Sequence, residues 1–327
     1  MFLLTKSAAL LFLVLHAAPV SSETGSFNDD LSDGIHLFEA GKLDAAKEIF
    51  ENFLEENPEN AEAYYYLGRT LFRKNDLKKA EKNFKTAVKL VPNSSLYHTW
   101  LGHTYGNRIN NVGFFKKMGM AKNIKKHYRI ALDLDENNID ALDGIITFHT
   151  EAPGIAGGSK DKAKEYAAKL KKLDKYLGYS AFGRIYEKEK KYDLAEAEYK
   201  SAITEFPEKI NIRFRLGYFY QRREKFDEAF DVFEKMLADS SNNLAALYQI
   251  GRTGALSGQN LDRAEECFKQ YVQHPEEANP SKASAHWRLG MVYEHKQQKD
   301  LAREHYRMAL KLEPDHKQAK KALKKLQ

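Results

Sequence analysis

The chain has 327 residues, of which 43% are hydrophobic and 30% charged, a mixture that favours a soluble helical protein and excludes a long disordered tract. Its formal net charge of +6 is small beside 52 basic and 46 acidic residues, so charge alone does not indicate nucleic-acid binding. The single cysteine, Cys267, excludes an internal disulfide, and its place on an apolar helix face predicts a buried thiol.

The N-terminal segment Met1–Ser22 has the pattern of a secretory signal peptide. Lys6 precedes an apolar run at Ala8–Leu15, and small residues lead to Ser22, after which we expect cleavage. The run is shorter than the roughly 20 apolar residues that cross a bilayer, and no later stretch reaches that length. No cysteine lies near the cleavage site, so we expect no covalent lipid anchor. The mature chain, residues 23–327, is therefore expected to be exported, with a retained N-terminal anchor as the alternative.

The rest of the sequence is dominated by one recurring pattern around a glycine. An apolar residue stands just before the glycine, and an alanine and then an aromatic residue follow it at fixed intervals. The glycines fall into two evenly spaced blocks: Gly34, Gly68 and Gly102, then Gly183, Gly217 and Gly251. Within each block the glycines are 34 residues apart, and a fixed spacing of this size indicates a stacked array of supersecondary units.

The second unit shows the physical meaning of the pattern. Gly68 and Ala80 are small where a first and a second helix would cross, because larger side chains would push the backbones apart. Apolar residues such as Leu71 and Phe84 recur at helical spacing, which places them on the faces that meet. Pro92 ends the second helix because it lacks a backbone donor. Each unit is therefore predicted to be two antiparallel helices joined by a short turn.

This pattern resembles the tetratricopeptide repeat, and the resemblance covers nearly the whole mature chain. It implies an all-α fold, a right-handed superhelical solenoid of tandem helix-turn-helix units with a C-terminal capping helix. The closing segment fits a cap, because its alanines and leucines share one face and lysines cover the rest. We predict eight units, at about residues 26–60, 61–94, 95–136, 137–175, 176–209, 210–243, 244–282 and 283–316, and a capping helix at 315–327.

The third and fourth units are longer than the others, because Gly102, Gly144 and Gly183 lie farther apart than the glycines of either block. Both insertions fall between the paired helices, at about Gly106–Asn123 and at Thr150–Ser159. Because they occupy the same place in adjacent units, we expect them side by side on one rim, as part of a binding surface. Two alternatives stay open: the aromatic side chains cover an edge of the core, or this basic segment touches a membrane. The rim residues are Phe114, Phe115, Pro153, Gly157 and Gly158.

The second insertion contains a glycine-rich stretch, Gly154–Lys160, that does not fit a phosphate loop, since its spacing differs and no strand precedes it. We expect a tight turn there, with Ser159 capping the next helix. The residues of this loop, of Trp100–Gly106 and of Tyr248–Gly258 resemble a set of exported tetratricopeptide-repeat proteins of proteobacteria. That resemblance implies secretion across the inner membrane into the periplasm of a Gram-negative bacterium, but no defined activity.

The resemblance also implies which side chains face a partner, because the first helix of each unit lines the concave face in this fold. The predicted groove is aromatic with interleaved arginines, which suits a protein or peptide segment with acidic and apolar residues. Single-stranded nucleic acid uses the same features, but export argues against it. The alternative is that several of these side chains only pack between successive first helices. The groove residues are Tyr65, Arg69, Phe72, Arg184, Phe214, Tyr218, Arg222, Tyr248, Arg252 and Trp287, with Arg73, Lys188 and Met291 beside them.

The sequence contains no motif for catalysis or metal binding: H-E-x-x-H and G-x-S-x-G are absent, and one cysteine excludes Cys–His zinc spacings. His98 and His103 share one predicted helix but not one ligand face, and we expect ordinary polar positions. We therefore predict no enzyme and no cofactor, but an exported scaffold or adaptor that holds envelope protein partners. Two alternatives remain: a factor associated with envelope lipid or polysaccharide, and a non-catalytic regulatory subunit of an enzyme complex.

Overall fold

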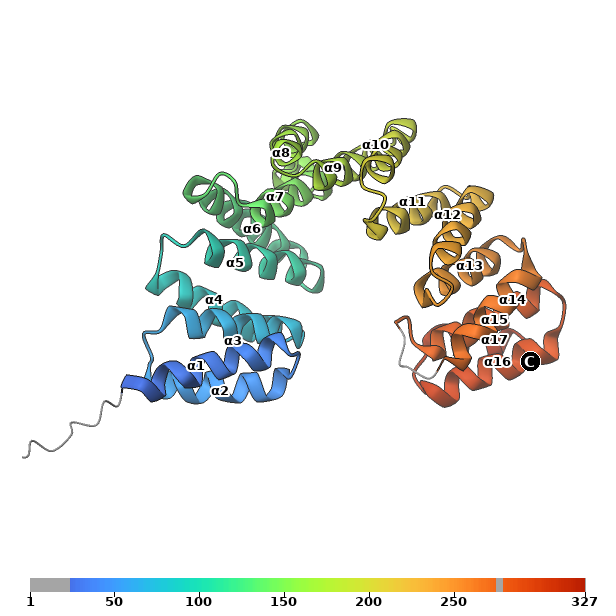
Figure 1. The fold of residues 1–327 in the computed structure, drawn as a ribbon, viewed down its shortest axis with the longest axis horizontal. Coiled ribbons are helices and arrows are strands. Elements are labelled where there is room, and N and C mark those ends of the chain that lie inside the picture. The colour runs from blue at the N-terminus through green and yellow to red at the C-terminus, as the bar shows by residue number, and fades with distance from the viewer. Residues whose placement is uncertain (1–23, 275–278, 327) are drawn as a thin grey trace, which may run out of the picture. The chain divides into compact units, whose positions relative to one another are not determined.

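A computed structural model describes residues 24–274 and 279–326, and in these residues the chain is a succession of antiparallel helices without a strand (Figure 1). The predicted signal peptide lies outside the described residues. Each predicted repeat contains one helix pair, and a last helix follows at the predicted cap. The predicted all-α array of helix-turn-helix units is thereby confirmed.

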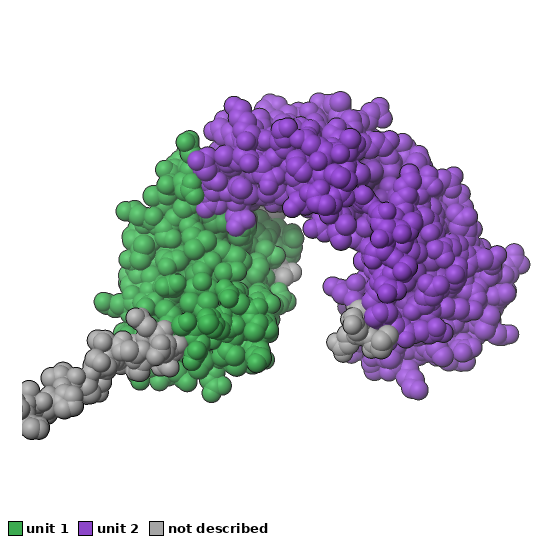
Figure 2. All heavy atoms as spheres, in the orientation of Figure 1, with its two compact units in different colours: residues 1–136 green, residues 137–327 purple. Residues whose placement is uncertain are grey.

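The chain divides into two compact units, residues 1–136 and 137–327, with the border between the third and fourth repeats (Figure 2). The first unit contains α1 (Thr24–Glu39), α2 (Leu43–Glu56), α3 (Ala61–Arg73), α4 (Leu77–Leu90), α5 (Ser95–Arg108), η1 (Ile109–Asn111) and α6 (Phe114–Leu134). The second contains α7 (Ile139–Glu151), η2 (Gly154–Ala156), α8 (Lys160–Leu173), α9 (Lys175–Lys188), α10 (Tyr192–Glu205), α11 (Ile210–Arg222), α12 (Phe226–Asp239), α13 (Leu244–Ser257), α14 (Leu261–Gln273), α15 (Lys282–His295), α16 (Lys299–Leu312) and α17 (Lys317–Lys325). Within each unit, the second helix of one pair packs on the first helix of the next.

Local chemistry sets the helix boundaries. The Asn60 side chain accepts a hydrogen bond from the Ala63 nitrogen at 2.9 Å and so caps α3. Ser159 caps α8 in the same way, at 3.4 Å from the Lys162 nitrogen, as predicted. Such a cap contributes about 1 kcal/mol. The tight turns inside several pairs contain one residue with a positive φ: Gly41, Asn75, Lys190, Glu224 and Gln297.

The repeated glycine marks the point where the paired helices cross. A Cβ added to Gly68 would lie 2.8 Å from Cε1 of Phe84, and one added to Gly102 would lie 2.7 Å from Cε1 of Tyr128. Both distances are too short for a real carbon contact, so a larger residue would force the helices apart. The predicted reason for the repeated glycine is therefore confirmed. The same pairing recurs between Gly34 and Phe50, Gly183 and Tyr199, Gly217 and Phe233, Gly251 and Phe268, and Gly290 and Tyr306.

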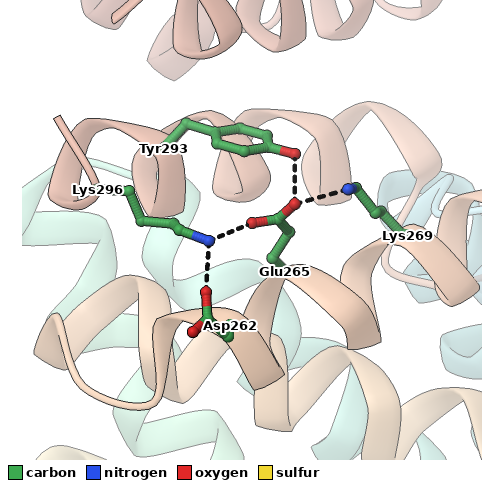
Figure 3. Close-up of polar contacts among 5 residues, drawn as sticks. All are labelled: Asp262, Glu265, Lys269, Tyr293 and Lys296. Atoms are coloured by element: carbon green, nitrogen blue, oxygen red, sulfur yellow. Dashed lines mark hydrogen bonds and ion pairs between the residues drawn. The ribbon is translucent and has the colours of Figure 1, made fainter. Parts of the chain in front are cut away.

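Charged side chains join the seventh repeat to the eighth. Glu265 of α14 accepts hydrogen bonds from Tyr293 of α15 at 2.9 Å and from Lys296, the residue that follows α15, at 2.6 Å (Figure 3). Lys269 donates to the same carboxylate at 2.6 Å, and Lys296 also donates to Asp262 at 2.6 Å. Burial alone would raise the pKa of Glu265, but the three hydrogen bonds outweigh burial and lower that pKa to about 2. The charged carboxylate therefore holds two neighbouring repeats together.

The first insertion is mostly helix. α6 begins at Phe114 and runs for 21 residues, so the extra residues lengthen the second helix of this pair at its N-terminal end. The second insertion forms η2 and a tight turn, in which Gly157 has a φ of 90° and a Cβ added to Gly158 would collide with the Ala152 carbonyl. The predicted tight turn is confirmed. Of the helices within residues 24–274 and 279–326, none is long and apolar enough to cross a membrane.

Cys267 of α14 is buried, as predicted. Burial raises the pKa of its thiol to about 12, so little reactive thiolate forms in the native protein. We expect the native protein at pH 8 to resist dithionitrobenzoate while the guanidinium-unfolded chain is labelled completely. Equal labelling rates in the two states would contradict this placement.

Candidate functional site

A pocket of about 490 Å³ lies on the second unit, mainly between the first helices α9 and α11. It brings together four predicted groove residues, Arg184, Lys188, Tyr218 and Arg222. The helix pairing explains this convergence, because successive first helices lie beside one another in the array. The remaining lining residues are Glu151 of α7, Glu187 of α9, Tyr199 of α10 and Arg215 of α11.

Both carboxylates of this pocket have internal partners. Glu151 forms an ion pair with Lys188 at 2.6 Å, and Glu187 forms one with Arg222 at 2.6 Å. The Tyr199 hydroxyl also donates to Glu187, at 2.6 Å. Burial raises the pKa of Tyr199, and the charge of Glu187 raises it further. A ligand would therefore meet acids that are already neutralised by their neighbours.

The pocket has an excess of positive charge, because four cations line it beside only two carboxylates. Arg184 pairs with Asp143 and donates to Thr147 at 3.0 Å, and its Nε is buried with no partner among the described residues. Arg215 is exposed, and it has no ion pair or hydrogen bond to a described residue. The sequence pattern did not indicate Arg215, since its place in the first helix is not one that the family resemblance assigns to the concave face.

Arg252 of α13 is held by neutral groups. Its Nη1 donates to Gln221 at 2.5 Å and to Gln249 at 3.2 Å, and Gln221 donates in turn to Thr253 at 2.8 Å. Burial lowers the pKa of Arg252, and the nearby positive charge of Arg288 lowers it further. The buried amide cluster therefore fixes the direction of Arg252 without compensating its charge.

A second pocket, of about 460 Å³, lies between α15 and the capping helix α17. The predicted groove residues Trp287 and Met291 line it from α15. Lys321 and Lys325 line it from α17, so two lysines of the cap face this pocket as well as the solvent. The cap therefore adds positive charge beside an aromatic side chain at this end of the second unit.

In the first unit, the predicted groove residues form a cluster between neighbouring helices. The guanidinium carbon of Arg69 lies 4.7 Å from the ring centre of Phe38 and 4.8 Å from that of Trp100. Phe72 meets Trp100 edge-on, with 5.6 Å between ring centres. Arg73 donates to the Phe38 carbonyl at 2.8 Å, at the C-terminal end of α1. These contacts join successive first helices, which was the alternative reading of the groove positions.

Two predicted groove residues are part of the core. Tyr65 and Tyr248 are only 5% and 4% exposed, and burial raises the pKa of Tyr65 to about 12. Tyr248 packs edge-on against Phe268, with 5.6 Å between ring centres. Phe214 is half-buried against Phe233. Tyr218 is half-buried like Phe214 but lines the pocket, although the same positional rule selected all four rings.

The insertions expose apolar side chains in different units. Phe115, at the start of α6, is 89% exposed, so it does not cover an edge of the core. The side chain of Phe114 lies outside what the structure describes. In the second unit, Ile155 of η2 is 81% exposed, and Pro153 beside it is exposed. Since α6 and η2 belong to different units, their predicted adjacency stays a prediction.

Two histidine pairs occupy corresponding places in the third and eighth repeats. The Nδ1 atoms of His98 and His127 lie 2.9 Å apart, and those of His286 and His305 lie 3.0 Å apart. His98 is only 4% exposed, and its Nε2 lies 3.0 Å from the Pro92 carbonyl oxygen, so both of its ring nitrogens have a polar neighbour. Each pair joins the residue four before the repeat glycine to the residue just before the aromatic partner of that glycine, a recurrence visible in the sequence. Across the described residues, no group of three His, Cys, Asp or Glu side chains is placed to hold a metal ion.

Comparison with known families and proteins shows where the chain has relatives. Three stretches match the tetratricopeptide repeat: residues 37–102, 180–243 and 283–316. Superkiller complex protein 3 of Mus musculus is 24% identical over 274 residues, which cover 73% of this chain and 17% of the mouse protein. The Homo sapiens protein of the same name is 25% identical over 272 residues, which cover 78% of this chain and 16% of the human protein. The chain thus spans about a sixth of the length of these relatives.

Solved structures share the fold. Yeast Tom70 superimposes with a TM-score of 0.69 at 16% identity, over 96% of this chain and 66% of Tom70. A tetratricopeptide repeat protein of Parabacteroides merdae superimposes with a TM-score of 0.55 at 14% identity, over 92% of this chain and 98% of that protein. At these identities the likeness is one of fold alone.

Proposed function

Because this chain belongs to the tetratricopeptide-repeat family, we propose that it is a scaffold or adaptor that holds protein partners on its first helices. The observation that carries the proposal is the pocket between α9 and α11, where Arg184, Arg222 and Tyr218 converge. Arginine and aromatic side chains carry most of the binding energy in protein interfaces. The mouse relative supports this reading by its name, which describes a protein of a complex.

In this proposal the chain has a non-catalytic role, because the repeats occupy nearly the whole mature chain. The partners are proteins of the cell envelope, and the protein acts in the periplasm, since the segment Met1–Ser22 has the pattern of a signal peptide. A measured protein mass that matches a chain beginning at Glu23 would support cleavage and export. A mass that includes Met1–Ser22 would instead indicate that the segment is kept as an anchor.

Site-specific photo-crosslinking in the cells that produce the protein tests the scaffold function. We expect p-benzoylphenylalanine at Tyr218, inside the pocket, to crosslink a distinct protein. The same group at Arg307, on the exposed side of the second helix α16, serves as the matched control and is expected to give no such product. Identical products at both positions, or liposome binding without any crosslinked protein, would refute the scaffold proposal; the second result would favour the lipid-associated alternative.

A further inference from the structure

Three arginines on successive first helices have no carboxylate partner among the residues that the structure describes. They are Arg215 of α11, Arg252 of α13 and Arg288 of α15, which we call the arginine ladder. Other arginines of the second unit show the contrast: Arg222 pairs with Glu187, and Arg213 pairs with Asp239. The ladder is therefore a row of positive charge that the described chain does not neutralise.

Two members of the ladder, Arg252 and Arg288, are partly buried, and an unpaired charge is costly in such a place. Arg252 donates only to neutral amide oxygens, and its guanidinium carbon lies 6.0 Å from the ring centre of Tyr218. The guanidinium carbon of Arg288 lies 4.6 Å from the ring centre of Trp287, and its Nε is buried without a hydrogen-bond partner. A carboxylate from a partner would supply the missing charge and accept two parallel hydrogen bonds from each guanidinium.

The spacing of the ladder selects the form of the ligand. Packed helices lie about 8–10 Å apart, and an extended chain advances about 3.3 Å per residue. Because α13 and α15 pack on each other, about three residues of an extended peptide span the step from Arg252 to Arg288. Tyr218 connects this step to Arg215, since its ring centre lies 6.0 Å from Arg252 and it lines the same pocket as Arg215. The flanking rings of Tyr218 and Trp287 offer apolar surface for the residues between the acids.

We propose that the partner segment is an extended acidic peptide with a carboxylate at every third or fourth residue, one each for Arg215, Arg252 and Arg288. This inference rests on the proposed scaffold function and names the chemistry of its partner. A peptide fits better than a nucleic acid, because Glu151 and Glu187 already pair with Lys188 and Arg222, which leaves separate free guanidinium groups and not a continuous positive groove. A nucleic acid brings a phosphate at every nucleotide and binds along a continuous positive groove, whereas a peptide can place one carboxylate at each free arginine and neutral residues between them.

Fluorescence anisotropy with the full chain tests this inference directly. The probe is a fluorescein-labelled peptide of four Glu-Ala-Tyr repeats, compared with a peptide of the same composition whose glutamates are grouped at one end and with an oligothymidylate of similar length. We expect the spaced peptide to bind most tightly. The single variant Arg215→Gln should weaken binding of the spaced peptide roughly tenfold or more. The double variant Arg252→Gln with Arg288→Gln should weaken it by at least as much.

A charge-matched control separates the ladder from general electrostatic attraction. Arg129→Gln with Arg307→Gln removes two exposed arginines from second helices, and we expect it to leave binding within about twofold of wild type. Arg215 is exposed, so its substitution tests the ladder even if the double variant unfolds. Equal binding of the two peptides, tighter binding of the oligothymidylate, or no effect of Arg215→Gln would overturn the inference. If crosslinks at position 218 persist in that case, the scaffold function stands and only the partner chemistry falls.

Discussion

Replacing Gly102 by valine is expected to destabilise the first unit by roughly 3 kcal/mol or more, because the helix crossing has no room for a side chain. A Cβ at this position would already lie 2.7 Å from Cε1 of Tyr128, and valine adds two methyl groups. Tyr128 is buried and its hydroxyl is within hydrogen-bond distance of His103 Nδ1, at 2.8 Å, so the ring is held in place. Either α5 and α6 separate or the tyrosine loses its site.

Gly119 provides the matched control within the same unit. It lies inside α6, and an added Cβ would have no atom within 4 Å. Gly119→Ala is therefore expected to stabilise the unit by about 1 kcal/mol, since alanine restricts the unfolded chain and favours helix. The protein has two tryptophans, Trp100 and Trp287, one in each unit. Guanidinium unfolding followed by Trp100 fluorescence in a Trp287→Phe background reports the first unit; equal stabilities of the two glycine variants would refute the crossing argument.

Acidification from pH 7 to pH 5 is expected to weaken both units through their histidine pairs. Burial, and after it the neighbouring His98, lower the pKa of His127 to about 4. Burial, and after it the neighbouring His305, likewise lower the pKa of His286 to about 4. Two imidazoles whose Nδ1 atoms lie about 3 Å apart share one proton, and a second proton would place two positive charges in contact.

The sign of the effect follows from proton linkage. The folded-state pKa of each of these two histidines lies below the unfolded value of about 6.5, so the unfolded chain binds more protons as the pH falls. The stabilisation is complete above about pH 6.5 and is lost as the pH falls towards 4. Lys85 and Lys126 act in the same direction on His127, as does Lys282 on His286. Because the rings keep some contact with water, we expect each pair to contribute about 1 kcal/mol to the loss of stability between pH 7 and pH 5. This is about half of what the full pKa shift would give over the same pH interval.

Variants that keep the ring but remove the titration test this prediction. His127→Phe retains the stack on Tyr105, whose ring centre lies 5.8 Å away, and should reduce the stability difference between pH 7 and pH 5 in the first unit. His286→Phe should do the same in the second unit, measured by Trp287 fluorescence in a Trp100→Phe background. His36→Asn removes an exposed histidine and is the control. A pH dependence that is unchanged in both phenylalanine variants would show that the pairs do not titrate as proposed.

The helix pairs and their crossings were predictable from sequence because they depend on local spacing. A glycine, an alanine and an aromatic residue at fixed intervals specify where two short helices meet, and the contact between Gly68 and Phe84 has the predicted geometry. The cap at Ser159 and the burial of Cys267 were predictable for the same reason. Each depends on residues within one repeat, and the tandem array presents the same evidence many times.

The composition of the candidate site was decided by tertiary structure. The positional rule selected Tyr248 and Tyr218 alike, but only the packing of neighbouring repeats buries the first and leaves the second at the pocket. The roles of Arg215 and of Gln221, an amide partner of Arg252, were not predicted, because they depend on side chains from a neighbouring repeat, far away in sequence. Sequence spacing determines which face of a helix a residue occupies, whereas burial, charge pairing and the absence of a counter-ion are set by the helices that pack against that face.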